Sequence, residues 1–478
     1  MRYETVIGLE IHAELATESK IYCSCSTAFG AEPNTQTCPI CTGMPGVLPV
    51  LNKKVVEYAV KAGLAMNCDI TEYGKQDRKN YFYPDLPKAY QTSQYDEPIC
   101  RNGYLDIDMD GGVRRIGITR IHIEEDAGKL IHDPIHGTSL IDYNRCGVPL
   151  IEIVTEPDMR SPEEAKAFLE SVKAILEYTG ISDCKMQEGS LRCDVNLSLR
   201  PEGQERFGTR TEMKNINSFR AAVRAMESEI LRQKELLEDG KEVVQSTRRW
   251  DDEKGMSYEM RSKEDSHDYR YFPEPDLVPI VISQEWVESI GSALPELPAE
   301  RRKRYTAELG LSDYDAAYLT SSKKLSDFFE DVIRFDVPAK SAANQLIGDI
   351  QRILRERNIE KIPFAPQRLA EVIRLTENGT ISSSAAKKVV EVLFEKDDDP
   401  KEIAKKLGLL QLNDVTALQG IVEKVLWENP RAVKEYQSGK EKAFGFLVGQ
   451  VMRLSKGSGN PKLITEILKS ALCGGEQK

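Results

Sequence analysis

The sequence predicts an α+β protein in which a mainly antiparallel sheet domain is followed by helices only. Three observations lead to this fold class. Short segments with alternating apolar and polar residues fill positions 1 to about 290, and this period of two is typical of half-buried strands. Helical periodicity replaces the alternation further on. The prolines of SALPELPAERR (292–302) mark the boundary between the two regions.

The alternating segments of the first region end at Gly, Pro or Asn, as strands do. They are VIGLEIHAEL, YLDIDM, RRIGITRIHIEED, PLIEIVTE, SLRCDVNLSL and GTRTEMKNI. Two helices are predicted between them. Ser161 is a suitable N-cap before Pro, so the first helix spans Pro162 to Tyr178 and stops before Gly180. The second spans about 218–237 and ends at Gly240.

The second region carries apolar residues three and four positions apart, which predicts helices. One stripe consists of Leu346, Ile347, Ile350, Ile353 and Leu354, and another of Leu369, Val372 and Ile373, with a stop signal at Asn378-Gly379. Further short helices are expected to start at Pro400, Asp414 and Pro461.

The composition bounds the class of protein. The chain has 478 residues, of which 40% are apolar and 30% charged, as in soluble proteins of several domains. No apolar run approaches the ~18 residues of a membrane span. The first ten residues lack the apolar segment of a signal peptide. We therefore expect a cytoplasmic protein without a membrane segment.

Polar residues share one face of several predicted strands, because successive side chains of a strand point to opposite sides. One segment groups Glu10, His12 and Glu14; the next groups Arg120, His122, Glu124 and Asp126, opposite Ile121, Ile123 and Glu125; others group Arg192, Asp194 and Asn196, and Glu212 with Lys214. Glu152 stands between two apolar neighbours.

Any one of these strands could simply face water. The set is unusual, because acidic residues and histidine recur where Thr and Lys are typical of a solvated sheet. Clustered carboxylates need a cation, and Mg²⁺ with oxygen ligands, often shared with substrate phosphates, suits them. Lys129 after Gly128 offers a phosphate-binding lysine. The P-loop, the dinucleotide fingerprint and the kinase motifs do not occur in the sequence.

Two segments combine aromatic residues with cations, DRKNYFYPDLPKAYQTSQY (77–95) and HDYRYFPEPDL (267–277). Such segments occur as stacking platforms for bases and as buried aromatic ridges, and the sequence leaves both interpretations open.

Four cysteines stand close together, Cys23, Cys25, Cys38 and Cys41. Their spacing, Cys-x-Cys followed by Cys-x-x-Cys, predicts a closed tetrahedral zinc site, which is structural rather than catalytic. Free reduced thiols are the alternative. The other cysteines suggest packing; they are Cys68, Cys100, Cys146, Cys184, Cys193 and Cys473.

Charge is distributed unevenly. The whole chain has a net charge of −12, yet residues 401–478 hold 13 Lys and Arg against 8 Asp and Glu, a net charge of +5. A basic end on an acidic body suggests two different partners, or else only a soluble helical surface.

Several long segments together resemble a known family, the GatB family, which is the B subunit of the bacterial tRNA-dependent amidotransferase. They are GLEIHAEL (8–15), DRKNYFYPDLPKAYQ (77–91), HIEEDAGK (122–129), DYNRCGVPLIEIVTEPD (142–158), EGSLRCDVN (188–196), EMKNINSF (212–219) and DYRYFPEPDL (268–277). The resemblance keeps its order over essentially the whole chain.

The resemblance implies a ligase that uses ATP and Mg²⁺ to phosphorylate the side-chain carboxylate of misacylated Glu-tRNA(Gln) or Asp-tRNA(Asn). Ammonia from a glutaminase A subunit then displaces the phosphate, and a small C subunit completes the heterotrimer. It implies a catalytic "cradle" domain at 1–292, a helical domain at 293–407 and a helical tRNA-binding tail domain at 408–478. The alternative is a zinc-containing RNA-binding scaffold without its own catalysis.

The resemblance and the strand faces together select the site residues. The catalytic candidates are Glu10, His12, Glu124, Glu125, Glu152 and Lys129, with magnesium held by Glu10, His12, Glu125 and Glu152. The candidates for binding the nucleotide are Lys79, Arg192, Lys214, Asp194 and Glu212. The tRNA-binding candidates of the tail are Lys440, Lys442, Arg453 and Lys456.

Overall fold

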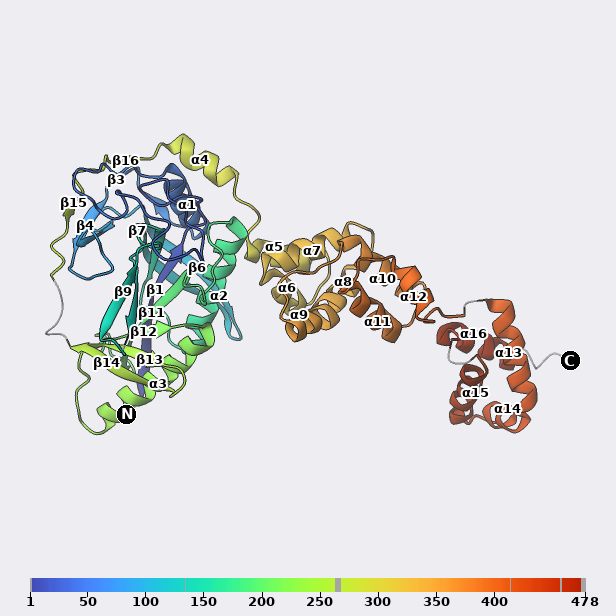
Figure 1. Ribbon diagram of the computed structural model, residues 1–478. Helices are drawn as coiled ribbons and strands as arrows, with labels where there is room; N and C mark the ends of the chain where they lie inside the picture. The colour runs from blue at the N-terminus through green and yellow to red at the C-terminus, as the bar shows by residue number, and fades with distance from the viewer. Residues whose placement is uncertain (1, 134, 263–267, 413, 456–457, 474–478) are drawn as a thin grey trace. The chain divides into compact units, whose positions relative to one another are not determined.

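The computed structural model describes residues 2–133, 135–262, 268–412, 414–455 and 458–473 (Figure 1). The chain divides into two compact units, Met1–Pro298 and Ala299–Lys478. The first is a sheet with helices and the second is helical, so the predicted α+β class is confirmed. The further division of the second unit near residue 407 stays a prediction.

A nine-stranded sheet forms the centre of the described part of the first unit. In order of neighbours its strands are β14 (Met256–Ser262), β13 (Ser246–Asp251), β12 (Thr211–Ile216), β11 (Leu191–Pro201), β1 (Tyr3–Glu14), β10 (Pro149–Thr155), β7 (Gly112–Glu125), β6 (Cys100–Met109) and β2 (Asp69–Ile70). Neighbours are antiparallel, except that β12 and β13 are parallel. Each predicted strand segment is part of this sheet.

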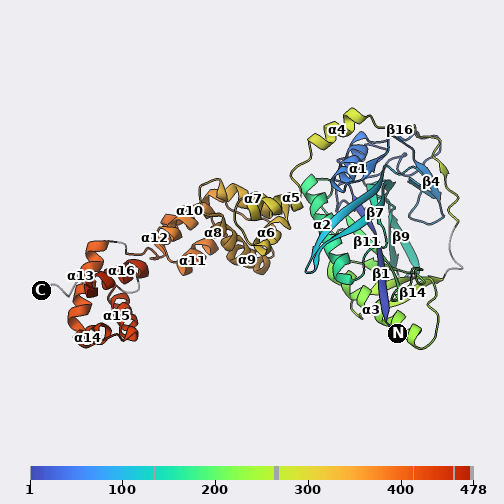
Figure 2. The ribbon, with the colours of Figure 1, turned by 180° about the vertical axis from the view of Figure 1, so that it is seen from behind.

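Helices cover the apolar face of the sheet. They are α1 (Lys53–Ala65), α2 (Pro162–Thr179) and α3 (Phe219–Glu238), with α4 (Gln284–Ser292) beside α1. Figure 2 shows α2 and α3 along the sheet from behind. The side chains of Ile11 and Ile153 from the sheet share one buried core with Phe168 of α2. The caps Ser161 and Gly180 of α2 stand where the sequence predicted them.

Small sheets surround the main one. They are β15 (Phe272–Pro273) with β4 (Asp77–Asn80) and β5 (Tyr90–Ser93), β16 (Ile280–Val281) with β3 (Tyr73–Gly74), and the hairpin of β8 (Lys129–Asp133) and β9 (Thr138–Asp142). These short strands were not predicted, because two to five residues are too few for alternation to show.

The second unit contains two separate hydrophobic cores, one from Tyr305 to Ala404 and one from Leu418 to Leu472. Its elements are α5 (Pro298–Ala307), α6 (Asp313–Thr320), α7 (Lys323–Ile333), α8 (Ala339–Gln345), the π-helical turn η2 (Leu346–Ile350), α9 (Gln351–Arg357), α10 (Pro366–Glu377), α11 (Ser383–Leu393), α12 (Pro400–Lys406), α13 (Val415–Glu428), α14 (Pro430–Gln437), α15 (Glu441–Leu454) and α16 (Pro461–Cys473). The helices predicted from Pro400, Asp414 and Pro461 are confirmed.

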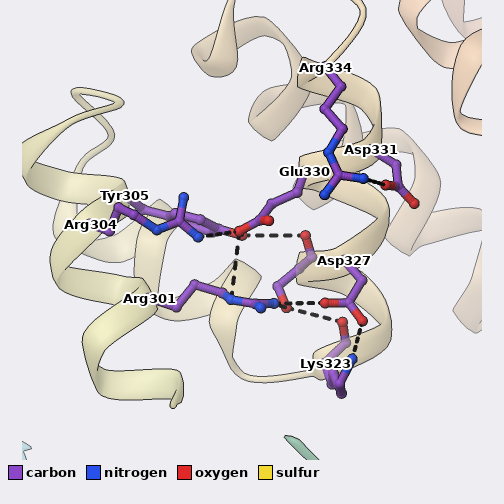
Figure 3. A network of polar contacts seen from close by, with 9 residues as sticks. Arg301, Arg304, Tyr305, Lys323, Asp327, Glu330, Asp331 and Arg334 are labelled. Atoms are coloured by element: carbon purple, nitrogen blue, oxygen red, sulfur yellow. Dashed lines mark hydrogen bonds and ion pairs between the residues drawn. The ribbon is translucent and has the colours of Figure 1, made fainter. Parts of the chain in front are cut away.

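Ion pairs fasten α5 to α7 (Figure 3). Arg301 Nη1 lies 2.8 Å from Asp327 Oδ1, and Arg304 Nη2 pairs with Glu330 Oε1. Tyr305 donates a hydrogen bond to the same Glu330 oxygen at 3.1 Å. This network orients the first helices of the second unit. No helix of the described residues is both long and apolar enough to cross a membrane.

Candidate functional site

The polar face of the central strands carries the candidate site. Directly opposite residues of an antiparallel pair project from the same face of the sheet. His12 of β1 stands opposite Glu152 of β10, and Glu152 stands opposite His122 of β7. On the other side of β1, Glu10 stands opposite Asp194 of β11. The register thus brings Glu10 and His12 together with residues more than a hundred positions further along the chain.

The first group, which we call the histidine cluster, comprises His12, His122, Glu124 and Glu152. His122 Nε2 lies 3.0 Å from Glu124 Oε1 and 3.2 Å from Glu152 Oε2, and His12 Nε2 lies 3.5 Å from the same Glu152 oxygen. Burial opposes the charge of His122, but Glu152 and Glu124 outweigh it and raise its pKa to about 9. Burial would raise the pKa of Glu152, yet His122 and other partners hold it well below its usual range.

The second group, the lysine cluster, comprises Glu10, Asp194, Glu212 and Lys214. Lys214 Nζ pairs with Asp194 and lies 2.8 Å from Glu212 Oε1, while Asn196 donates to Glu10 Oε1 at 2.9 Å. Burial and the charge of Glu152 raise the pKa of Glu10. The carboxylates of the lysine cluster and of the histidine cluster therefore lie close enough to affect one another.

The third group, the arginine cluster, comprises Glu14, Asp126, Arg145 and Arg192. Arg192 Nη2 lies 2.9 Å and Arg145 Nε 3.3 Å from Asp126 Oδ2. Burial and the neighbouring Asp126 raise the pKa of Glu14 to about 8. Arg145 was not among the predicted site residues, because it lies in the turn before β10, where no alternation marks it.

Two of the predicted catalytic residues lie apart from these clusters. The Glu125 side chain projects from the opposite face of β7, where Oε1 accepts bonds from Lys88, from the Thr92 amide and from the Thr92 hydroxyl, the last two at 2.8 Å. A cavity on that side is lined by Glu125, by Lys88 and by residues of the loop 23–43 that carries the four cysteines. Residues of the three clusters are not part of its lining. Lys129 is exposed on β8.

Lys79 on β4 adds a cation beside the histidine cluster. Burial opposes its charge, but Glu124, Tyr271 and Glu152 raise its pKa above the ordinary value. Its Nζ lies 5.2 Å from the centre of the Tyr269 ring, and that ring meets Tyr271 edge-on at 6.1 Å. The two aromatic segments of the sequence therefore meet around this lysine.

The carboxylates and histidines fit a hard divalent cation. One ligand atom from each of His12, Glu124 and Glu152 lies within 4.8 Å of the others, and the same holds for Glu10, Asp194 and Glu212. Carboxylate oxygens are the ligands that Mg²⁺ prefers. In the second set Lys214 pairs directly with two of the three carboxylates, Asp194 and Glu212. Lys79 lies beside the histidine cluster and, among the described residues, forms no ion pair with it, so we regard the histidine cluster as the better candidate.

The four cysteines form a separate candidate metal site. All four Sγ atoms lie within 4.8 Å of one another. A tetrahedral site with Zn–S bonds of about 2.3 Å requires sulfur atoms roughly 3.8 Å apart, and Cys38 and Cys41 meet this at 3.9 Å. A hydrogen bond from Cys23 lowers the pKa of Cys41 to about 5, against the effect of burial. The donor set fits zinc.

The predicted tRNA-binding residues lie at the end of the chain. Lys440 precedes α15, and Lys442 and Arg453 are exposed on it. Lys456 lies outside the described residues.

Comparisons with known proteins cover both units. Residues 5–288 match the GatB/GatE catalytic domain, and residues 327–472 match the GatB domain. Three similar proteins are each named as the B subunit of an aspartyl/glutamyl-tRNA(Asn/Gln) amidotransferase. That of Caldicellulosiruptor bescii is 61% identical over 477 residues, 99% of both chains. Those of Thermoanaerobacter pseudethanolicus and Moorella thermoacetica are 58% and 54% identical, each over 99% of this chain and 100% of the other.

Proposed function

The chain belongs to the GatB family of amidotransferase B subunits, and we therefore propose that it phosphorylates the side-chain carboxylate of misacylated Glu-tRNA(Gln) or Asp-tRNA(Asn). The γ-phosphoryl group of ATP passes to a carboxylate oxygen, which gives ADP and an acyl phosphate. Ammonia then attacks the acyl carbon and phosphate leaves, so the product is Gln-tRNA(Gln) or Asn-tRNA(Asn). The relatives' names state the two tRNA substrates.

One observation carries this proposal: carboxylates, histidines and cations from five neighbouring strands meet on one sheet face. His12, Glu124 and Glu152 would hold Mg²⁺, whose chemistry is to neutralise the transferring phosphoryl group. Lys79 and Arg192 would bind phosphate oxygens. Because phosphoryl transfer depends on positioning and charge neutralisation, a rigid sheet is a suitable support.

Partners are part of the proposal. Ammonia would come from a glutaminase A subunit, and a small C subunit would complete a cytoplasmic heterotrimer. The cysteine cluster would hold structural zinc, which fixes the loop of residues 23–43 without taking part in the reaction.

The assembled enzyme tests the proposal directly. It would be given Glu-tRNA(Gln), labelled ATP, Mg²⁺ and ammonium chloride in place of glutamine, and then Asp-tRNA(Asn). We expect ADP and an amidated aminoacyl group with at least one of the two tRNAs. A folded complex that binds both intact tRNAs and amidates neither would refute catalysis and favour the RNA-binding scaffold.

We also propose that the tail binds the tRNA body. Replacing Lys440, Lys442 and Arg453 together by Ala should weaken tRNA binding about tenfold and reduce its salt dependence, because fewer counterions are released from the phosphates. Filter binding over a range of salt concentrations measures both quantities. The control replaces the three lysines of α12, Lys401, Lys405 and Lys406. Equal affinity of the tail variant and the wild type would refute the assignment.

A further inference from the structure

A lysine is buried next to the cysteine cluster. Lys20 has no exposed surface, and its ammonium donates to Cys41 Sγ at 3.7 Å and to the backbone carbonyl of Tyr143 at 3.3 Å. Among the described residues, no carboxylate lies within ion-pair distance of Lys20. The sulfur of Cys41 is therefore the group that can supply it with a negative charge.

A buried ammonium is costly unless an anion lies beside it. Four thiolates around Zn²⁺ carry a net charge of −2, which is equally costly to bury without a cation. The buried ammonium of Lys20 beside Cys41 Sγ is therefore placed to offset part of the negative charge of a metal-loaded cluster.

We propose that Lys20 compensates the negative charge of the metal centre. Lys20 is not itself a zinc ligand; its ammonium donates a hydrogen bond to Cys41, which is one of the four ligands, and so stabilises the tetrathiolate zinc. The inference rests on the proposed structural zinc. Removing a residue that hydrogen-bonds to a metal ligand typically changes the metal affinity by about 10–100-fold.

Lys20 also connects the metal centre to the polar face of the sheet. Besides the bond from Lys20 to Tyr143, the Cys146 thiol donates to the Cys41 carbonyl at 3.3 Å, and the Ile21 amide donates to Gly147 at 2.9 Å. The same turn carries Arg145, which pairs with Asp126. Lys20 is thus a positioning residue that lies between the metal centre and the turn before β10.

The test is zinc retention by the full chain. Wild type, purified without chelator, should hold about one equivalent of zinc. Lys20→Met keeps the length of the side chain and removes the charge, so it should release zinc to a chromogenic chelator about tenfold faster. Lys61→Met is the matched control, because the Lys61 ammonium also donates to a backbone carbonyl, that of Thr179, and has no hydrogen bond to a thiol among the described residues.

A second readout reports the charge itself. In the cobalt-substituted protein, the sulfur-to-metal charge-transfer band should move to longer wavelength in Lys20→Met, because a nearby cation lowers the energy of the sulfur electrons. If Lys20→Met does not fold, Lys20→Gln retains a donor and still lacks the charge, and it should also release zinc faster.

The outcomes are distinct. A wild type with less than half an equivalent of zinc would refute the structural zinc and this inference with it. A zinc-loaded wild type whose folded Lys20 variants release metal at the same rate would refute the role of Lys20 alone. Neither result bears on amidation, which the assembled enzyme tests separately.

Discussion

Replacing Glu152 by Gln in the assembled enzyme is expected to lower the rate of ATP-dependent amidation by at least about 100-fold. The Glu152 carboxylate is one of the three candidate metal-binding groups of the histidine cluster, and His12 and His122 both approach the same oxygen, at 3.5 Å and 3.2 Å. An amide has nearly the same size but no charge, so it would bind a divalent cation and the two imidazoles more weakly. Formation of ADP and of amidated tRNA measures the loss.

Glu156→Gln is the matched control, since Glu156 is exposed just beyond β10 and accepts a bond from Thr119. We expect it to retain the wild-type rate. Binding of Mn²⁺, followed by electron paramagnetic resonance, should weaken in Glu152→Gln only. A folded Glu152→Gln enzyme with wild-type turnover would remove Glu152 from the proposed catalytic residues.

Much of this face could be predicted from the sequence, because alternation along a strand is a local property. Glu10 and His12 on β1, and Asp194 and Arg192 on β11, project from one face as their positions require. The caps of α2 were also predictable, since Ser161 and Gly180 act within a few residues of the helix. Local chemistry determines both features.

Other features depend on pairing between distant strands and could not be predicted. Alternation did not show that Arg145 and Arg192 meet at Asp126, because one of them lies in a turn. Lys129 follows a glycine near the acidic segment, yet it belongs to a separate hairpin and is exposed. Spacing in the sequence says little about where such a hairpin projects.

Glu125 illustrates a conflict between two kinds of inference. We predicted Glu125 as a magnesium ligand from the resemblance and the strand faces together, although alternation along this segment places it opposite Glu124. In the structure its carboxylate faces Lys88 and Thr92, on the far side of β7 from the histidine cluster. The position of a residue within its strand was therefore the better guide to its surroundings.

Glu125→Gln is accordingly expected to lower stability around β7 by about 3 kcal/mol while leaving Mn²⁺ binding unchanged. The Glu125 residue is 2% exposed, so the substitution leaves the Lys88 ammonium in a largely buried position without its carboxylate. Such a loss costs more than the ion pair contributes, because the remaining charge is uncompensated. Hydrogen exchange of peptides that cover β5 and β7 measures the local stability.

A double-mutant cycle separates this effect from metal binding. Lys88→Met combined with Glu125→Gln removes both charges, and it should recover part of the stability that Glu125→Gln loses alone. The two residues act as a pair only if the double variant loses less stability than the sum of the losses of the two single variants. If Glu125→Gln instead lost Mn²⁺ binding at wild-type stability, its carboxylate would have to reach the metal, and the separation of the two faces of β7 described above would not hold in the working enzyme.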